Sequence, residues 1–494
     1  MLMVSSSARL TPAKKTSGLA LWMERVLEEC DRASLGLSPD TVHDLRVSLR
    51  RCRSVADGIM AIDPDPEWKQ MKKAGKRLFS SLGALRDVHV MQEWVSRLAS
   101  PDDQVTAALL LHLHNRESQF KQDASQALLE FDRKQWKKWS ATLSRRASRL
   151  RPGSAVFKHL ALERWTQAHE LHRRALRNRS QVAFHNLRIG LKRFRYLVEN
   201  FLPEQHAAWS GDLKELQDLL GQVHDLDVLW SAVLRLNAFP ATESRSHWHA
   251  QIIAERSQRI EKYRSKMLGK DSLWQAWRAA LPAGKEVRTA GLSRLKRWGS
   301  ALDPDFKHSN HVAKLALQLY QALPVRGQHS DSHSCDQRAI LQIAALLHGV
   351  GRSRGKTKSH KATYKLIDRL PPPLGWTTEE LHLAAVVSRY HQGALPHAGQ
   401  TSLHGLTPSQ RQIVSHLAAI LRLADAFDAN RDGRIQRLVV EQQAGFILIR
   451  AQGYSPRDKM AERIAATRHL FETVYRRPVM VKALVAKRAK ARQG

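Results

Sequence analysis

Two segments of the sequence carry the same pattern of histidine and cationic side chains. Val42–Ser54 reads VHDLRVSLRRCRS, and Phe184–Leu197 reads FHNLRIGLKRFRYL. Each copy places one histidine and three cations at positions i, i+3, i+7 and i+10, which share one face of an α-helix. Guanidinium and ammonium groups bond the oxygens of phosphate groups, so two such faces favour binding of a polyanion. The matched residues are His43, Arg46, Arg50 and Arg53 in the first copy and His185, Arg188, Lys192 and Arg195 in the second.

The alternative interpretation of these segments is a pair of ordinary solvated helix faces, where Lys and Arg are common. Solvated faces usually mix the two signs of charge, because like charges repel one another. From Arg173 to Val198, however, there are eight Lys or Arg residues and no Asp or Glu. The repeat also preserves the histidine, which random surface charge does not explain. We therefore favour a functional basic surface.

The elements that position these residues are predicted to be long amphipathic helices between residues 15 and 280. The duplication continues beyond the basic segments, since Ser81–Met91 reads SLGALRDVHVM and Leu219–Leu229 reads LLGQVHDLDVL. A repeat of this length predicts two similar helical bundles, at about 15–140 and 150–280. If the two copies face each other, their basic edges form one channel. The matched glycines and aspartates are Gly83 with Gly221 and Asp87 with Asp225.

The overall composition points to an anionic polymer as the partner. The chain has 80 Lys and Arg against 46 Asp and Glu, a formal net charge of +34. A field of this sign attracts nucleic acid, anionic membranes or a polyphosphate-like polymer, and it says nothing about the fold. No apolar run approaches the roughly 20 residues that span a membrane, and the N-terminus lacks the apolar stretch of a signal peptide. Together with the three widely spaced cysteines, Cys30, Cys52 and Cys335, this predicts a cytoplasmic protein with no membrane partner.

The second half of the sequence predicts a different arrangement. The helical pattern weakens at 286–306, where several glycines and prolines favour a linker. Another helical region is predicted at 307–432, followed by a small α/β segment at 433–485. In that segment, RLVVEQQAGFILIR turns at Ala444-Gly445 and predicts a β-hairpin, and PVMVKALV predicts a last strand. The predicted fold class is therefore mainly α, with a small α/β tail.

Three residues of the second half have the order found in helical metal phosphohydrolases. His308 precedes a helix, His348 ends the apolar helix IAALLH, and Asp425 lies in LRLADAFD. A hydrolytic divalent metal needs several His and carboxylate ligands, and a His-Asp dyad would supply one of them after His348. The chain has Gly349 there. We therefore treat the three residues as vestigial metal ligands and assign neither a catalytic residue nor a cofactor; a divalent metal is expected only if this site functions.

The duplicated segments resemble the CHAD domain, a helical domain defined by a repeated histidine motif. The resemblance covers about residues 15–285 and rests on VHDLRVSLRRCRS, FHNLRIGLKRFRYLVENF and the two segments that contain Gly83 and Gly221. It implies two helical bundles around a basic channel that binds inorganic polyphosphate, and localisation on polyphosphate granules. The matched His, Arg and Lys residues would line that channel. Lys72 and Lys76, which precede Gly83, are added as further candidates.

Residues from about 300 to 485 resemble the C-terminal region of the exopolyphosphatase/guanosine pentaphosphatase family, an HD-type helical domain with a small α/β tail. The matching stretches are HSNHVAKLALQLY, AALLHGVG, SRYHQGALP and LRLADAFD. The sequence departs from the pattern at Gly349, where an HD domain has Asp, and at Lys361, where related sequences often have His. It also lacks a segment resembling the actin-like region that carries the family's phosphatase chemistry. Enzymatic activity is therefore not favoured.

The leading hypothesis from the sequence is a protein that binds inorganic polyphosphate and is associated with polyphosphate granules or metabolism. Its expected partners are polyphosphate and polyphosphate-metabolising enzymes. One alternative is a metal-dependent phosphohydrolase that acts on polyphosphate or guanosine polyphosphate through the HD-like domain. A second alternative is a nucleic-acid-binding protein, but no helix-turn-helix, zinc-finger spacing or aromatic RNA-binding pattern supports it. Nucleic acid is therefore expected only as a non-specific competitor.

Overall fold

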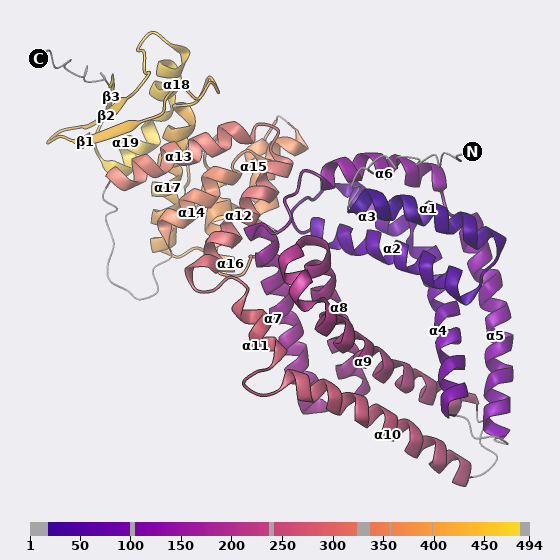
Figure 1. Ribbon diagram of the computed structural model, residues 1–494. Helices are drawn as coiled ribbons and strands as arrows, with labels where there is room; N and C mark the ends of the chain where they lie inside the picture. The colour runs from indigo at the N-terminus through magenta and orange to yellow at the C-terminus, as the bar shows by residue number, and fades with distance from the viewer. Residues whose placement is uncertain are drawn as a thin grey trace, which may run out of the picture. The chain divides into compact units, whose positions relative to one another are not determined.

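The computed structural model describes residues 18–98, 104–236, 242–323, 336–355, 357–397 and 399–484 (Figure 1). These residues form nineteen α-helices and three short strands, so the prediction of a mainly α protein with a small α/β tail is confirmed. The chain divides into two compact units, which are described separately. The first is formed by residues up to 283 without the short segment 62–64, and the second by residues from 284 onward.

The first unit is entirely helical in its described part. Its two basic helices begin at capped serines, because Ser38 Oγ accepts a hydrogen bond from the Thr41 backbone N–H and Ser180 Oγ accepts one from Ala183, both at 3.2 Å. Pro39 at the first position of α2 further favours a helix start there. The helices are α1 (Leu19–Leu35), α2 (Pro39–Ile59), α3 (Pro66–Ala74), α4 (Lys76–Leu98), α5 (Gln104–Leu129), α6 (Arg133–Ala147), α7 (Ala155–Asn178), α8 (Gln181–Phe201), α9 (Pro203–Leu236), α10 (Thr242–Met267) and α11 (Leu273–Ala279).

The apolar stripes of the two basic helices are buried, which leaves their cationic faces to line a different surface. On α2 the stripe of Leu45, Leu49 and Cys52 has no exposed surface, and on α8 the same holds for Leu191 and Phe194. Helix α2 packs against α1, α4 and α8, and α8 packs against α7 and α9. The core therefore fixes the rotation of both helices about their axes, and with it the direction of their cations.

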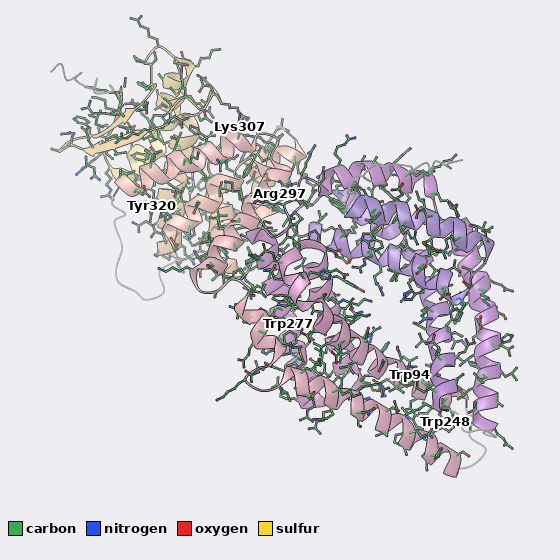
Figure 2. The ribbon with its side chains drawn as sticks, in the orientation of Figure 1. Trp94, Trp248, Trp277, Arg297, Lys307 and Tyr320 are labelled. Carbon is green, nitrogen blue, oxygen red and sulfur yellow. The ribbon has the colours of Figure 1, made fainter. Side chains whose placement is uncertain are left out.

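A separate apolar cluster joins the two helical pairs α4–α5 and α9–α10 of the first unit. Trp94 of α4 and Trp248 of α10, labelled in Figure 2, are 5% and 2% exposed within it. Leu226 of α9 is fully buried in the same cluster. This packing brings α4 and α9 together, so that residues of both can line the space beside α2 and α8.

The second unit has a core of small and branched apolar side chains from α13, α14, α16 and α17. Capping boxes define the starts of two of these helices, with Thr377 and Glu380 on α16 and Thr407 and Gln410 on α17. The helices are α12 (Lys285–Leu302), α13 (Phe306–Ala322), α14 (Gln337–Leu347), α15 (Ser359–Asp368), α16 (Thr378–Arg389), α17 (Pro408–Ala426), α18 (Lys459–Thr467) and α19 (His469–Tyr475), with short 3-10 helices η1 (Val350–Arg354) and η2 (Thr401–Leu403).

The linker expected at 286–306 is wrong for most of its length, since Lys285–Leu302 forms α12 in the second unit. The glycines that weakened the helical pattern are sites of close packing. A Cβ atom on Gly291 would lie 2.9 Å from the Trp376 ring, and one on Gly299 would lie 2.5 Å from Leu347. Helical glycine therefore lets neighbouring side chains approach α12, and it does not interrupt the helix here.

The C-terminal segment forms the predicted hairpin and last strand. β1 (Leu438–Gln442) pairs antiparallel with β2 (Ile447–Ala451), and β2 pairs parallel with β3 (Val479–Ala483). The parallel connection contains α18 and α19, as a parallel crossover requires. Cys30 and Cys52 are buried free thiols, and Cys335 lies outside the described residues. Within those residues, no helix combines the length and apolar character needed to span a membrane.

Candidate functional site

Cations from three helices of the first unit converge on one cleft, whose fourth wall is α9. The cleft has a volume of about 330 Å³. It contains Arg46 and Arg50 from α2, Arg86 from α4, and Arg188 and Lys192 from α8. The structure thus brings together four of the cations predicted from the repeat, two from each copy, and the predicted His43. Arg86 was missed, because its own segment has no cationic periodicity that would single it out.

Arg46 is held in place by the N-terminal half of α4. Its Nη1 donates a hydrogen bond of 3.0 Å to the Phe79 carbonyl, and its guanidinium lies 4.5 Å from the centre of the Phe79 ring. A Cβ atom on Gly83 would lie 2.4 Å from Arg46 Nη1, so glycine provides the space that this guanidinium occupies. A Cβ atom on the matching Gly221 would have no neighbouring atom within 4 Å, so the two copies differ at this position.

Tyr196 of α8 forms an aromatic support for two more cations of the cleft. The Arg50 guanidinium lies 5.8 Å from the centre of its ring, and Lys192 Nζ lies 5.9 Å from it. The Nε atom of Arg50 is buried and has no hydrogen-bond partner within the described part of the chain, and the same is true of the Tyr196 hydroxyl. An aromatic face stabilises a cation without neutralising it, so the positive charge stays available to a ligand.

The cleft is lined by more cations than carboxylates, five against the three aspartates Asp87, Asp218 and Asp225. Among the described residues, Arg46, Arg50, Arg188 and Lys192 form no ion pair, whereas Arg86 lies 3.3 Å from Glu93. Burial, followed by the nearby Arg50 and Arg188, lowers the pKa of Lys192 from 10.5 to about 7. Burial also lowers the pKa of Arg46 and of Arg50. Burial and the neighbouring cations thus disfavour the charged form of these groups, and a polyanion in contact with them would favour it.

Two matched carboxylates, Asp87 and Asp225, also line the cleft. Burial raises the pKa of Asp225 to about 6; Arg188 opposes this rise, and the negative charge of Asp87 adds to it. The repeat had identified both residues, but only as landmarks of the duplication. Their type gave no reason to place them in a basic site.

The two repeated histidines have different surroundings. His43 lines the cleft, and burial followed by Arg86 lowers its pKa. His185 lies outside the lining of the cleft, with its Nδ1 3.4 Å from Nδ1 of His224 on α9. Burial, Arg188 and His185 lower the pKa of His224 to about 4, so this ring is neutral at pH 7. His224 is thus a second histidine near the site that the repeat did not single out.

The other predicted cations lie outside this cleft. Arg53 donates a 2.7 Å hydrogen bond to the Lys72 carbonyl, and both residues line a second cleft of about 510 Å³. Lys72 Nζ is paired there with Asp57. Lys76 is exposed at the first position of α4, and Arg195 is half-buried on α8; neither lines the two clefts.

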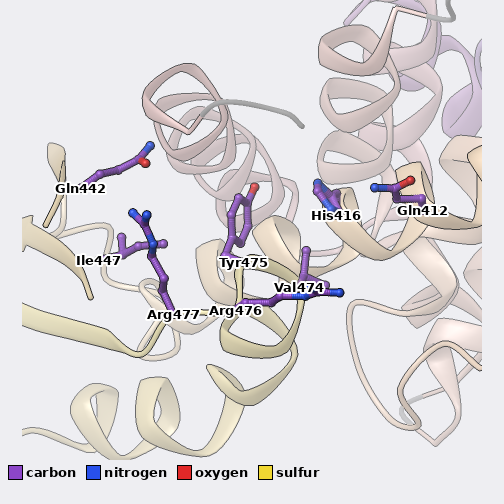
Figure 3. Close-up of a pocket in the computed structure, with 8 residues that line it drawn as sticks. All are labelled: Gln412, His416, Gln442, Ile447, Val474, Tyr475, Arg476 and Arg477. Atoms are coloured by element: carbon purple, nitrogen blue, oxygen red, sulfur yellow. The ribbon is translucent and has the colours of Figure 1, made fainter. Parts of the chain in front are cut away.

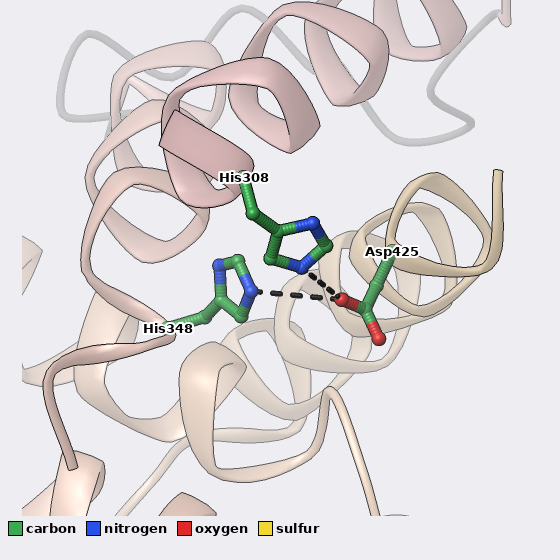
Figure 4. Close-up of side chains that lie close together, drawn as sticks. All are labelled: His308, His348 and Asp425. Carbon is green, nitrogen blue, oxygen red and sulfur yellow. Dashed lines mark hydrogen bonds and ion pairs between the residues drawn. The ribbon is translucent and has the colours of Figure 1, made fainter. Parts of the chain in front are cut away.

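The three vestigial ligands of the second unit do lie together. His308 is on α13, His348 caps α14 and Asp425 is on α17; one ligand atom of each lies within 4.8 Å of the others (Figure 4). His308 Nε2 is 3.0 Å from Asp425 Oδ1, and its Nδ1 is 2.7 Å from Asp428. Burial by itself lowers the pKa of His308, but the hydrogen bonds to both aspartates outweigh it and raise the pKa to about 9. This histidine is therefore an imidazolium between two carboxylates.

The environment of Gly349 does not fit a hydrolytic metal site. A Cβ atom there would lie 2.1 Å from Asp303 Oδ2, so the Asp303 carboxylate fills the space of the side chain that an HD dyad requires. Asp303 is itself engaged, because Ser309 Oγ donates to it at 2.5 Å and Arg352 lies 3.9 Å away. Asp425 is the single carboxylate among the three candidate ligands. We therefore derive no metal-dependent step at this site.

Comparison with known proteins identifies both parts of the chain. Residues 19–234 match the family model of the CHAD domain, and residues 287–452 match that of the Ppx/GppA phosphatase, domain III. The chain thus contains a CHAD domain followed by a region similar to domain III of these phosphatases. Both families relate to polyphosphate, and the two matches point to a function connected with this polymer.

One solved structure that the chain matches is the crystal structure of the CHAD domain from the plant Ricinus communis. It is 24% identical in sequence, and the match covers 54% of this chain and 90% of that chain with a TM-score of 0.36. No curated protein matches the chain.

Proposed function

We propose that the chain binds inorganic polyphosphate in the cleft between α2, α4, α8 and α9. The observation that carries the proposal is the set of four cations in one cleft without an ion-pair partner among the described residues. A cluster of cations that form no ion pairs attracts a ligand of opposite sign. The residues are Arg46, Arg50, Arg188 and Lys192.

The chemistry of these side chains suits a flexible chain of phosphates. Each guanidinium can bond two phosphate oxygens at once, and the lysine adds a point charge. Counterions released from the polymer supply much of the affinity of such interactions, so binding should weaken steeply with salt. The aspartates of the cleft disfavour a ligand that covers the whole surface, and they favour one that follows the cations.

The second cleft extends this interaction along the same two helices. Arg53 of α2 and Arg193 of α8 line it, and Tyr196 contributes to its wall. The Phe79 ring lies between the clefts, with its centre 4.5 Å from the Arg46 guanidinium and 5.1 Å from that of Arg53. We propose that a long polyphosphate continues past Tyr196 into this cleft, whereas a short one occupies the first cleft alone.

The experiment that tests the proposal measures binding of long-chain polyphosphate to the full-length protein. One variant replaces all four cations of the first cleft with Gln, and the expected result is loss of binding with unchanged helical content. The matched control replaces four exposed cations of α6 with Gln, the same number of cationic side chains, so it should retain most of the affinity. Its residues are Lys134, Lys137, Lys138 and Arg145. Equal losses in the two variants would refute the assignment of the cleft.

Duplex DNA as a competitor separates polyphosphate binding from general attraction to nucleic acid. If the cleft is the polyphosphate site, DNA at equal phosphate concentration should displace little of the bound polymer at physiological salt. Complete displacement would favour the nucleic-acid alternative. In cells, we expect a fluorescent fusion of the wild-type chain to collect on polyphosphate granules, and the fourfold Gln variant to stay dispersed in the cytoplasm.

A further inference from the structure

A separate pocket lies at the C-terminal end of the second unit, where α17, α19 and the small sheet meet. Figure 3 shows the eight side chains that line it. Its volume is about 330 Å³, which is within the range of small-molecule sites. None of these residues belongs to the polyphosphate cleft or to the histidine cluster around Asp425. The lining consists of Gln412 and His416 from α17, Gln442 and Ile447 from the hairpin, and Val474, Tyr475, Arg476 and Arg477.

The charge of this pocket is positive and uncompensated. Arg476 and Arg477 both line it, no carboxylate does, and neither arginine forms an ion pair with a described residue. The nearest acidic residue in sequence, Glu472, is already used, because it accepts a 2.9 Å hydrogen bond from the Val479 N–H and lies 3.4 Å from Arg468. Arg477 makes one weak contact, a 3.4 Å hydrogen bond to the Gln443 carbonyl. Two guanidinium groups are therefore available to an anion.

Two buried polar groups of the pocket lack hydrogen-bond partners in the described structure. His416 is only 9% exposed, and its Nδ1 is buried without a partner. The hydroxyl oxygen of Tyr475 is buried in the same way, and the two rings lie 5.5 Å apart. Buried polar groups in native proteins almost always have partners, and leaving them without one is destabilising. A ligand that enters the pocket would supply hydrogen-bond partners for both groups.

We propose that this pocket binds a phosphate monoester, with its phosphate on Arg477 and its organic part against His416 and Tyr475. One guanidinium can bond two phosphate oxygens with defined geometry, and Arg476 adds positive charge to the same pocket. A bare phosphate would fill only part of the volume and would leave the histidine and tyrosine without partners. The side-chain amides of Gln412 and Gln442 can bond hydroxyl or ring groups of the ester, and Ile447 and Val474 provide apolar walls. This site would work independently of the polyphosphate cleft.

The test uses the full-length protein and calorimetric titration with AMP, ribose 5-phosphate and glucose 6-phosphate as monoesters. Orthophosphate and adenosine are the comparison ligands. At least one monoester should bind with 1:1 stoichiometry and more tightly than either comparison ligand. Arg477→Gln should weaken that binding by about tenfold or more, as expected for loss of a charged hydrogen bond. Arg457 is an exposed arginine of the second unit that lies outside the pocket, so Arg457→Gln should leave monoester binding unchanged.

A second variant gives a readout that a purely structural role would not produce. Tyr475→Phe removes only the hydroxyl, so it should raise the melting temperature of the free protein and weaken the binding of the monoester. If the tyrosine served only for packing, the substitution would not raise the melting temperature and weaken monoester binding at the same time. Failure of all three monoesters to bind at millimolar concentration, orthophosphate binding as tightly as the best ester, or an unchanged affinity in both pocket variants would each overturn the proposal. None of these outcomes affects polyphosphate binding in the first unit.

Discussion

Lys192 should make polyphosphate binding depend on pH in a range where arginines and the interior phosphates of a long chain do not titrate. Burial and the charges of Arg50, Arg188 and Arg46 lower its pKa to about 7, with Asp87 acting in the opposite direction. A polyanion next to the amine favours the charged form, so binding should be accompanied by uptake of a proton. Affinity is then highest below pH 7 and falls as the pH rises above the pKa of the free site.

The size of the effect follows from the two pKa values. If polyphosphate restores the ordinary value of 10.5, the complex holds one proton more than the free protein between pH 7 and pH 10.5. One pKa unit corresponds to about 1.4 kcal/mol, so the affinity falls almost tenfold per pH unit in this window. Between pH 7 and pH 9 the predicted loss is roughly 50-fold. In the free protein the pKa of His43 and that of His224 are lowered and that of Asp225 is about 6, so these groups hold few protons above pH 7.

The assay is a titration of labelled polyphosphate at constant ionic strength from pH 6 to pH 9, for the wild type and for Lys192→Arg. Arginine keeps its charge throughout, so the variant should bind with nearly constant affinity. Calorimetry in buffers of different ionisation enthalpy should count about one proton taken up by the wild type at pH 8 and almost none by the variant. A flat wild-type profile, or the same decline in Lys192→Arg, would refute this explanation of the site.

The stability of the free protein should change with pH in the opposite direction to its affinity. The pKa of Lys192 is lower in the folded state than in the unfolded chain, so the unfolded chain binds more protons between pH 7 and pH 10.5. The contribution of this group to stability therefore rises with pH across that window. Lys192→Met, which has no charge to bury, should stabilise the free protein at pH 7 and weaken polyphosphate binding. Thermal unfolding with and without polyphosphate measures both effects.

Three further predictions concern packed or buried positions. Gly83→Ala should displace the Arg46 guanidinium from Phe79. The affinity for polyphosphate should then fall roughly tenfold, as expected for loss of one charged hydrogen bond, while the melting temperature changes little. Gly349→Asp should destabilise the second unit by at least 1–3 kcal/mol in urea unfolding, because its Cβ collides with the Asp303 carboxylate, and adding Asp303→Ala should recover part of the loss. Cys52 is fully buried and its thiol pKa is raised, so iodoacetamide should modify it only after unfolding, as detected by mass spectrometry.

The repeat predicted the cations of the cleft because helix periodicity is local. Positions four residues apart share a face whatever surrounds the helix, so Arg46 with Arg50 and Arg188 with Lys192 could be paired from spacing alone. Arg53 follows the same spacing but lies seven residues beyond Arg46, about 10 Å farther along α2. There it meets the backbone of Lys72 and lines the second cleft. Periodicity gives direction about a helix axis, whereas the neighbouring helices decide what each turn faces.

Features that depend on tertiary packing could not be predicted in the same way. The glycines of α12 indicated a linker, yet Gly291 and Gly299 accommodate Trp376 and Leu347 from elsewhere in the second unit. The sequence showed that an aspartate is missing after His348, but it could not show that Asp303 fills the space of that side chain. The pocket beside Tyr475 had no local signal, because its residues come from α17, the hairpin, α19 and the turn after α19.

The unequal glycines of the two copies bear on how a polymer lies in the cleft. Polyphosphate has the same chemistry read from either end, so reversing the polymer in the cleft leaves every contact the same. The difference between the two copies therefore belongs to the protein alone: Arg46 occupies the space over Gly83, while the space over Gly221 is open. A bound segment should accordingly meet a fixed guanidinium in one half of the cleft and have room to shift in the other.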